Sequence, residues 1–260
     1  MEKFIALFDI HMGWELKRVR GEQVVVPTMN EKAIKIALDF ANDFKPDIII
    51  FGGDQLNCKP ISHWDKHSPG RIGNFTVKDE LDAFNDIVLD KLRFKHKVRR
   101  IWHKGNHEAW MDQLLDSNPG IKGLVSIESY LGLPRRGFEL YDSGEVSQTG
   151  KINWLHGDII PGGVNVARVG ALRFNSNIRF GHYHCYQTYT LHNPVDVTDV
   201  RTSTSLPCLA SRSPDYGQNA PNQWVNGFSY GWIKDNGNFN DYVVVIADDC
   251  AVIDGREYIG

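Results

Sequence analysis

Five short segments of this 260-residue chain combine side chains that bind divalent metal ions. Together they supply aspartate, asparagine and histidine, and this mixture of oxygen and nitrogen donors suits Mn, Fe, Zn or Ni rather than Ca. The sequence therefore predicts a metal centre. The segments are Asp9-Ile10-His11, Gly52-Gly53-Asp54, Gly105-Asn106-His107-Glu108, His156-Gly157 and Gly181-His182-Tyr183-His184.

Short apolar runs precede these segments, as expected for β-strands. The runs at 4–8, 48–51 and 178–180 are clear, whereas those at 98–102 and 152–155 are looser. In α/β sheets the loops that follow strand ends are where ligands gather, so five such loops can converge on one cleft. Each motif alone could be a turn, a helix cap or a surface loop. Because all five follow strand ends, we interpret them as parts of one site.

The ordered set of motifs resembles the calcineurin-like metallophosphoesterase superfamily, over residues 9–184. The opening Asp9-x-His11-x-Gly13 is similar to that of the DNA-repair exonucleases of this superfamily. The resemblance implies an α/β fold, a two-sheet β-sandwich flanked by helices, with a binuclear phosphoesterase site. It assigns one metal to Asp9, His11 and His184 and the other to Asn106, His156 and His182, with Asp54 bridging both.

Two divalent metal ions are the expected cofactors, with Mn favoured and Fe, Zn, Ni or Mg as alternatives. Two cations about 3.5–4 Å apart can stabilise both the attacking and the leaving oxygen of an in-line displacement, and can supply hydroxide near neutral pH. His107 is then the predicted catalytic residue, because it can protonate the leaving oxygen or stabilise phosphoryl charge. Glu108 or Asp158 is expected to orient a ligand imidazole.

The substrate is less sharply indicated than the chemistry. The motif around Asp54 ends in Asn57-Cys58, where many relatives have Asp and the protein Ser/Thr phosphatases continue with Arg. Without this arginine, the site lacks a guanidinium group that could bind two oxygens of a phosphate monoester at once. A predicted rim insert at about 57–76 could stack on a base or contact phosphate, or it could be a surface loop whose tryptophan packs on the body. Its candidate substrate contacts are Trp64, Lys59, Lys66 and Arg71.

We therefore expect a phosphodiesterase that acts on nucleic acid or nucleotides. The alternative is a phosphomonoesterase that acts on phosphoprotein or a small metabolite. A non-catalytic metal-binding scaffold is disfavoured, because all seven ligand positions and His107 are present. A phosphate-ester substrate, nucleic acid among the candidates, is the only partner that the sequence indicates.

Composition fits a single domain over 1–260, with 42% hydrophobic and 23% charged residues. The net charge of −3 excludes a global basic field, so polyanion binding would need a local patch and the metals. The basic run at 91–100 is interpreted as a solvated helix end. Four scattered cysteines match no zinc spacing and favour reduced thiols in a cytoplasmic protein. We expect neither a signal peptide nor a membrane span.

Helices are predicted at about 28–44, with a Thr28-x-x-Glu31 capping box, at about 77–94 and at about 164–174. The C-terminal portion, at about 185–260, is predicted to be β-rich. Its hairpin signals are Asp235-Asn236-Gly237 and Asp254-Gly255, and we expect these hairpins to complete the second sheet.

Overall fold

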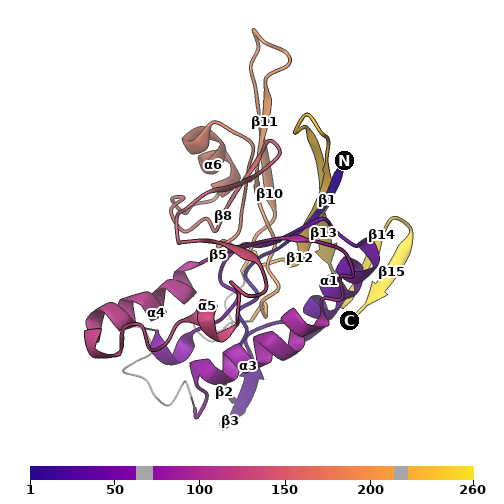
Figure 1. The fold of residues 1–260 in the computed structure, drawn as a ribbon. Helices are drawn as coiled ribbons and strands as arrows, with labels where there is room; N and C mark the ends of the chain where they lie inside the picture. Colours follow the sequence, from indigo (N-terminus) through magenta and orange to yellow (C-terminus); the bar gives the residue numbers. More distant parts are fainter. Residues whose placement is uncertain (63–72, 214–221) are drawn as a thin grey trace.

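Two β-sheets packed face to face form the centre of the molecule, and helices cover their outer faces (Figure 1). The computed structural model describes residues 1–62, 73–213 and 222–260. The first sheet has the strand order β13-β12-β1-β4-β5-β6, and the second has the order β10-β11-β9-β8-β7. The predicted fold, a two-sheet sandwich flanked by helices, is confirmed.

The strands of the first sheet are β1 (Glu2–Leu7), β4 (Ile48–Phe51), β5 (Arg99–His103), β6 (Phe138–Tyr141), β12 (Asn226–Ile233) and β13 (Phe239–Ile246). Those of the second are β7 (Ser147–Thr149), β8 (Ile152–Leu155), β9 (Ile178–Phe180), β10 (Gln187–His192) and β11 (Val200–Ser205). Two hairpins stand apart as β2 (Trp14–Val19) with β3 (Glu22–Pro27) and β14 (Cys250–Ile253) with β15 (Arg256–Ile259). The helices are α1 (Glu31–Phe44), α3 (Val77–Ile87), α4 (Asn106–Ser117), α5 (Ile127–Tyr130) and α6 (Val166–Phe174), with short 3-10 turns η1 (Lys59–Ile61), η2 (Leu89–Lys91) and η3 (Pro119–Ile121).

The central strands carry continuous apolar runs because both of their faces are buried, although β1 starts with Glu2-Lys3 and β5 with Arg99-Arg100. In β1, Phe4 and Ala6 point between the sheets, where Phe4 meets Trp154 of β8 with ring centroids 5.3 Å apart. Ile5 and Leu7 point to the other face and pack under the helices. Alternation along a strand thus serves two separate cores, and this explains the uninterrupted apolar runs in the sequence.

Two predicted helices form with corrected ends. Asn30, not Thr28, caps α1, since its side chain accepts a hydrogen bond from the backbone N–H of Ala33 at 3.1 Å. Thr28 instead donates its hydroxyl to the carbonyl of His11. The second helix ends at Ile87 and continues only as the turn η2, so it is shorter than predicted. None of the described helices is long and apolar enough to cross a membrane.

The C-terminal portion contributes to both sheets, so the prediction that it completes the second sheet is wrong. The hairpin at Asp235-Asn236-Gly237 forms as predicted, but it joins β12 to β13 in the first sheet, where β12 lies antiparallel to β1. Only β10 and β11 enter the second sheet. The turn at Asp254-Gly255 closes a separate hairpin. Hydrophobic alternation marks a strand but does not indicate which sheet it joins.

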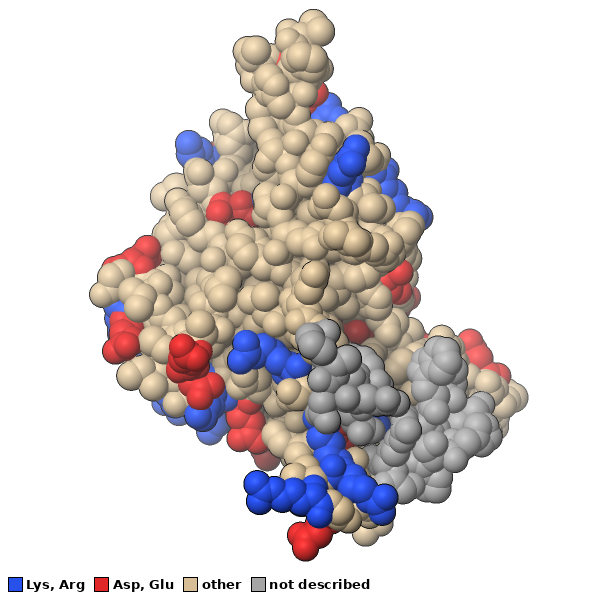
Figure 2. All heavy atoms as spheres, turned by 180° about the vertical axis from the view of Figure 1, so that it is seen from behind, with Lys and Arg blue, Asp and Glu red and all other residues tan. Residues whose placement is uncertain are grey.

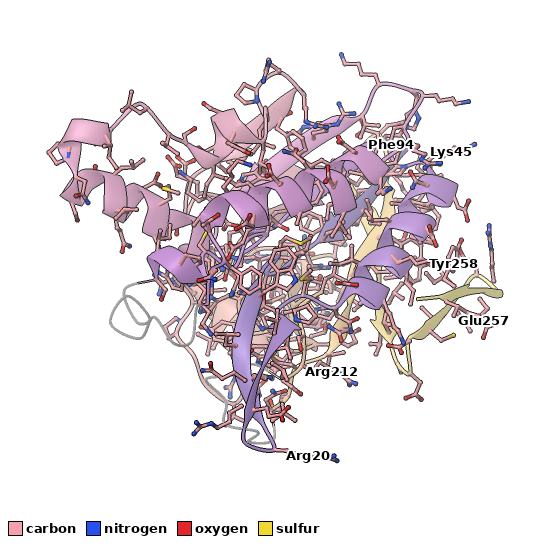
Figure 3. All side chains as sticks on the ribbon, turned by 90° about the horizontal axis from the view of Figure 1, so that it is seen from below. Arg20, Lys45, Phe94, Arg212, Glu257 and Tyr258 are labelled. Carbon is pink, nitrogen blue, oxygen red and sulfur yellow. The ribbon has the colours of Figure 1, made fainter. Side chains whose placement is uncertain are left out.

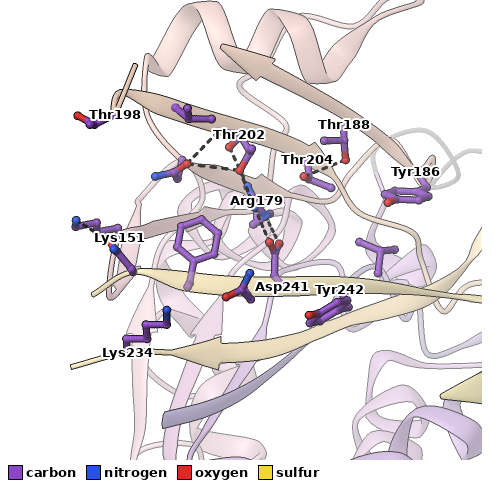
Figure 4. Close-up of a pocket in the computed structure, with 16 residues that line it drawn as sticks. Lys151, Arg179, Tyr186, Thr188, Thr198, Thr202, Thr204, Lys234, Asp241 and Tyr242 are labelled. Carbon is purple, nitrogen blue, oxygen red and sulfur yellow. Dashed lines mark hydrogen bonds and ion pairs between the residues drawn. The ribbon is translucent and has the colours of Figure 1, made fainter. Parts of the chain in front are cut away.

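A buried ion pair ties the two sheets together beside a groove of about 750 Å³. Arg179 of β9 contacts Asp241 of β13 through two hydrogen bonds, of 2.5 Å and 2.9 Å, and Figure 4 shows its guanidinium pointing toward that carboxylate. The side chains of Arg179 and Asp241 are 2% and 15% exposed. None of the predicted metal ligands lines this groove, so it is distinct from the metal centre.

Replacing Asp241 by alanine should lower the free energy of unfolding by about 3–5 kcal/mol, because the change leaves a buried guanidinium unpaired. Chemical denaturation measures this loss. Asp39→Ala is a matched control, since Asp39 pairs with Lys35 on the exposed surface of α1 and should cost about 0.5 kcal/mol or less. Equal losses for the two variants would contradict a structural role for the inter-sheet pair.

Candidate metal centre

All five motifs lie where a parallel strand ends. Asp9, Asp54 and Asn106 follow β1, β4 and β5, which are parallel neighbours in the first sheet. His156 and His182 follow β8 and β9, which are parallel neighbours in the second sheet. The carboxyl ends of these strands therefore bring the motifs to one edge of the sandwich, as the sequence predicted.

Backbone hydrogen bonds hold the motif loops against each other. The N–H of Asp9 donates to the carbonyl of Gly53 at 3.1 Å, and the N–H of His11 donates to the carbonyl of Asp54 at 2.9 Å. Across the second sheet, the N–H of Gly181 donates to the carbonyl of His156 at 2.7 Å. The relative positions of the ligand-type side chains are therefore set by the backbone.

The side chains gather into three overlapping groups, and two of them match the two expected metal positions. Asp9, His11 and His184 form the first group, and each offers a donor atom within 4.8 Å of the others. Asp54, His156 and His182 form the second. Asn106 belongs with this second group, since its Oδ1 lies 3.1 Å from Nε2 of His156. The third group consists of His11, Asp54 and His107 and joins the other two.

The donor atoms converge as they would around cations. Nε2 of His11 lies 3.1 Å from Nε2 of His184, and Oδ2 of Asp54 lies 3.2 Å from Nε2 of His156 and 3.8 Å from Nε2 of His11. Asp54 thus stands between the two groups, where a bridging ligand must be. Among the described residues, the buried Nδ1 atoms of His182 and His184 have no hydrogen-bond partner. Oxygen and nitrogen donors at these separations fit a pair of divalent ions.

Carbonyl and amide oxygens set which imidazole nitrogen faces the centre. Nδ1 of His156 lies 3.1 Å from the carbonyl of Gly52, which can only accept, so Nε2 is the nitrogen that would bind a metal once it loses its proton. Nδ1 of His11 lies 3.3 Å from Oδ1 of Asn57. The expectation that Glu108 or Asp158 orients a ligand imidazole is wrong for His156 and His11, because a backbone oxygen and an amide oxygen have that role there.

Five of the seven ligand candidates have a left-handed backbone. The φ angles of Asp9, His11, Asp54, His182 and His184 lie between 51° and 69°. A non-glycine residue rarely adopts this conformation, which costs on the order of 1 kcal/mol or more and clusters at functional sites. The folded chain therefore holds these side chains in place against the preference of their own backbone.

Two motif glycines leave room for the carboxylates. A Cβ at Gly105 would lie 2.1 Å from Oδ1 of Asp54, and one at Gly181 would lie 2.3 Å from Oδ2 of Asp9. Because the space is taken, the backbone itself contacts the carboxylates. The N–H of His107 donates to Oδ1 of Asp54 at 2.9 Å, and the N–H of His182 donates to Oδ2 of Asp9 at 2.9 Å.

Glu108 is fully buried and supports the Asp54 loop. Its carboxylate accepts hydrogen bonds from the N–H groups of Asp54, Leu56 and Gly105 at 3.0, 2.8 and 2.9 Å. Burial first, and then the charge of Asp54, raise the pKa of Glu108 to about 7. The fourth residue of the Gly-Asn-His-Glu motif therefore links the loop that carries Asp54 to the start of α4.

Charges in the centre are strongly coupled. Burial would raise the pKa of Asp54, but His156 and His107 outweigh burial and hold it well below its ordinary value. Burial would lower the pKa of His156, but Asp54 outweighs it and raises the pKa to about 10. For His11, burial prevails and lowers the pKa well below its usual range. The cluster therefore attracts positive charge next to Asp54.

His107 lies beside the two groups with a fixed orientation. Its Nδ1 donates to the carbonyl of Asn57 at 2.6 Å, since that oxygen only accepts. Its Nε2 lies 3.8 Å from Oδ2 of Asp54 and faces the centre. His107 can therefore give a proton from Nε2 only as the imidazolium, which is the form that a general acid requires.

Two tryptophans that the sequence did not single out contact the site histidines. Trp110 packs against His107 with ring centroids 4.1 Å apart, and Trp224 packs edge-on against His184, also at 4.1 Å. Trp110 lies three residues after His107 on α4, so helical spacing could have indicated it. No local pattern links Trp224 to His184. Both rings are half-buried.

The structure does not support the predicted substrate contacts as it supports the grouping of the ligand-type side chains. Trp64, Lys66 and Arg71 lie outside the described residues. Lys59 is buried and its ammonium lies 2.9 Å from Glu15, with both side chains under 10% exposed. The expectation that Lys59 contacts substrate finds no support, because its charge is engaged in the interior.

His103, at the end of β5, should make the folded protein sensitive to acid. It is buried, its Nε2 lies 2.7 Å from Oγ of Ser147, and burial is the main cause that lowers its pKa to about 3. Below its ordinary pKa of 6.5 the unfolded chain binds a proton that the folded chain excludes, so stability falls as the pH falls.

From about pH 7.5 to about pH 5, the wild type should lose about 2 kcal/mol more than His103→Gln. Urea unfolding in the presence of chelator measures the difference, because chelator removes the metal-linked titration. Parallel losses in the two proteins would show that His103 is not the responsible group.

In comparisons with known proteins, the chain shows only a distant structural similarity to solved structures. No family model and no curated protein matches the chain. Solved structures that it resembles include Vps29 of Chaetomium thermophilum (8% identity, 100% of this chain and 99% of that chain covered, TM-score 0.47) and the phosphoesterase Yfce from E. coli (13%, 94% and 100%, 0.39). A dimetal phosphatase from Danio rerio also matches (10%, 94% and 95%, 0.44).

Identities and TM-scores of this size support no argument about function, which must come from the site itself. The side chains of all five motifs do meet at one edge of the sandwich, in the groups described above. In the order of its motifs, the chain resembles the calcineurin-like metallophosphoesterases.

Proposed function

We propose that this protein is a binuclear metal-dependent phosphoesterase that hydrolyses phosphodiesters, in nucleic acid or nucleotides. The observation that carries the proposal is the convergence of two donor groups on either side of Asp54, with Nε2 of His107 facing the same point. Asp9, His11 and His184 would hold one ion. Asn106, His156 and His182 would hold the other, and Asp54 would bridge both.

When bound, two divalent ions would polarise the phosphoryl group and lower the pKa of a water molecule toward neutrality. The chain itself has three tasks. Glu108 and the backbone hold Asp54 in place, the Asn57 carbonyl holds the ring of His107, and Nε2 of His107 delivers a proton to the leaving oxygen. Proton delivery matters most for leaving groups that are poor as anions.

The loop after Asp54 favours a diester over a monoester. The position after Asn57 is Cys58, whose side chain is buried, and the next residue, Lys59, pairs with Glu15. The described part of this loop, residues 55–62, therefore directs no cation at the outer oxygens of a phosphate. A diester carries one negative charge and needs less positive charge there than a monoester dianion. The half-buried rings of Trp110 and Trp224 beside the histidines suit a flat substituent.

The decisive experiment is a hydrolysis panel with protein stripped by chelator and reloaded with Mn²⁺. The substrates are single- and double-stranded DNA, RNA, cyclic nucleotides, nitrophenyl mono- and diesters, and a phosphopeptide. We expect two ions per chain by elemental analysis, no turnover in chelator, and the highest kcat/KM on a diester.

Two results would count against the proposal. At most one tight ion, with undiminished turnover after chelation, would contradict the binuclear site. A kcat/KM for the phosphopeptide or another monoester well above that for every diester would favour the alternative, a phosphomonoesterase.

A further inference from the structure

The hairpin formed by β2 and β3 projects from the body at the end of the molecule that carries the metal-ligand loops (Figure 1). It follows directly on the first motif, because His11 is only three residues from Trp14, where β2 starts. We call residues 14–27 the arm. A two-residue turn closes it, with φ of 52° at Arg20 and 91° at Gly21, between the paired residues Val19 and Glu22.

The base of the arm is fixed to the metal centre. The N–H of Thr28 donates to the carbonyl of Gly13 at 3.0 Å, and its hydroxyl donates to the carbonyl of His11 at 2.6 Å. Trp14 stacks on Phe75 with ring centroids 5.4 Å apart. Since both ends of the arm are bonded around the first motif, its direction relative to the ligands is set.

The outer part of the arm is basic although the chain as a whole has a net charge of −3. Arg18 and Arg20 are exposed, and Arg212 is exposed on the neighbouring segment, which contacts the arm where Lys17 donates to the carbonyl of Ser213. Within the described part of the chain, no ion pair engages these three guanidinium groups. Glu22 is the one exposed acidic residue of the arm.

The figures agree with this placement. Lys and Arg atoms gather at the lower end of the molecule, where Figure 1 places the tip of the arm (Figure 2). Figure 3 shows Arg20 and Arg212 at one end of the view and Phe94 and Lys45 at the other. The basic run at 91–100 is therefore a different surface. It ends within the first residues of β5, whose opposite, carboxyl end leads to Asn106.

We propose that the arm is a nucleic-acid-binding extension of the active site, which holds the phosphate backbone of a polynucleotide whose scissile diester lies at the metal centre. At about 3.3 Å per residue, Arg18 and Arg20 lie about 17 Å and about 23 Å from Gly13 along the arm. Within a DNA duplex one strand advances about 3.4 Å per nucleotide, so on a duplex these cations reach phosphates about five to seven nucleotides from the cut.

A polynucleotide fits this layout because one molecule brings both the diester for the centre and evenly spaced charges for the arm. An acidic peptide offers charge without a diester, and a dinucleotide offers a diester without the length. The inference rests on the proposed phosphodiesterase function and makes it specific, since substrates should be longer than about five nucleotides for full affinity.

The first test is binding in chelator, where hydrolysis cannot occur. The probe is labelled single-stranded DNA of about 20 nucleotides, and the variant is Arg18→Gln/Arg20→Gln/Arg212→Gln. Its Kd at about 0.1 M salt should rise about 10- to 100-fold, and the slope of log Kd against log salt should fall by about 2, as expected for three lost phosphate contacts. Lys91→Gln/Arg93→Gln/Lys95→Gln removes the same charge from the far surface and should bind like wild type.

The second test is hydrolysis with Mn²⁺, where the arm variant should raise KM for the long DNA and leave a dinucleotide unaffected. If no ester is hydrolysed, the proposed function fails, while the binding result still decides the role of the arm. Three results would overturn that role: wild-type binding by the arm variant, equal losses in both triple variants, or an equal loss on a labelled polyglutamate. The substituted side chains are exposed, and an unchanged Tm confirms that each variant folds.

Discussion

Replacing Asp54 by asparagine should empty both metal positions and reduce the rate of hydrolysis by about three decades or more. Asp54 stands between the two donor groups, and its Oδ2 is the carboxylate oxygen nearest to His156, at 3.2 Å. Asparagine keeps the shape but offers one neutral oxygen, so it cannot hold two cations. The loss of metal removes several kcal/mol of transition-state stabilisation, at about 1.4 kcal/mol per decade.

Elemental analysis and the turnover of a nitrophenyl diester measure the two effects. The matched control is Asp47→Asn, at the opposite end of β4, where the carboxylate accepts from the N–H of Lys3 at 2.8 Å. That variant should retain two ions and the wild-type rate. Full metal occupancy in Asp54→Asn would show that the bridging assignment is wrong.

Replacing His107 by asparagine should leave the metals bound and lower the rate by about two to four decades, the usual contribution of a positioned proton donor. The structure gives a physical reason to separate the two effects. The backbone N–H of His107, which asparagine retains, holds Asp54, whereas the imidazole reaches the centre only through Nε2.

The leaving group makes this experiment specific. A nitrophenolate departs without a proton, so its ester should lose little in His107→Asn, whereas an alkyl ester or a nucleic acid should show the full loss. Equal losses on all esters would exclude proton donation as the role of His107. An empty metal site in this variant would place His107 among the ligands instead.

The convergence of the five motifs could be predicted from the sequence because the information for it is local. Each ligand follows an apolar run that forms a strand of nearly the expected bounds, and parallel strands bring their carboxyl ends together. The helix α4 was missed because it starts at Asn106, inside a motif whose residues were considered only for their chemistry. The role of Glu108 was missed for the same reason, since a motif does not show which backbone groups fold back onto it.

The pairing of strands that lie far apart in the sequence could not be predicted from the sequence. Nothing in residues 226–246 indicates that β12 should lie beside β1 and not in the second sheet, since both choices bury the same alternating face. The arm was missed because Arg20 occupies a left-handed turn position where Asn or Gly is the usual signal. Trp224 lies forty residues after His184 and meets it only in the folded chain.

The left-handed backbone at the ligand positions sets the stability of the metal-free fold against catalysis. Glycine would relieve the backbone at His11, His182 or His184 and leave the metal-free fold more relaxed there, at the expense of the site. A laboratory population selected only for heat resistance should therefore accumulate inactive chains at these positions. A directed-evolution screen of this protein must therefore measure turnover together with heat resistance. Substitutions at these residues that favour one of the two properties act against the other.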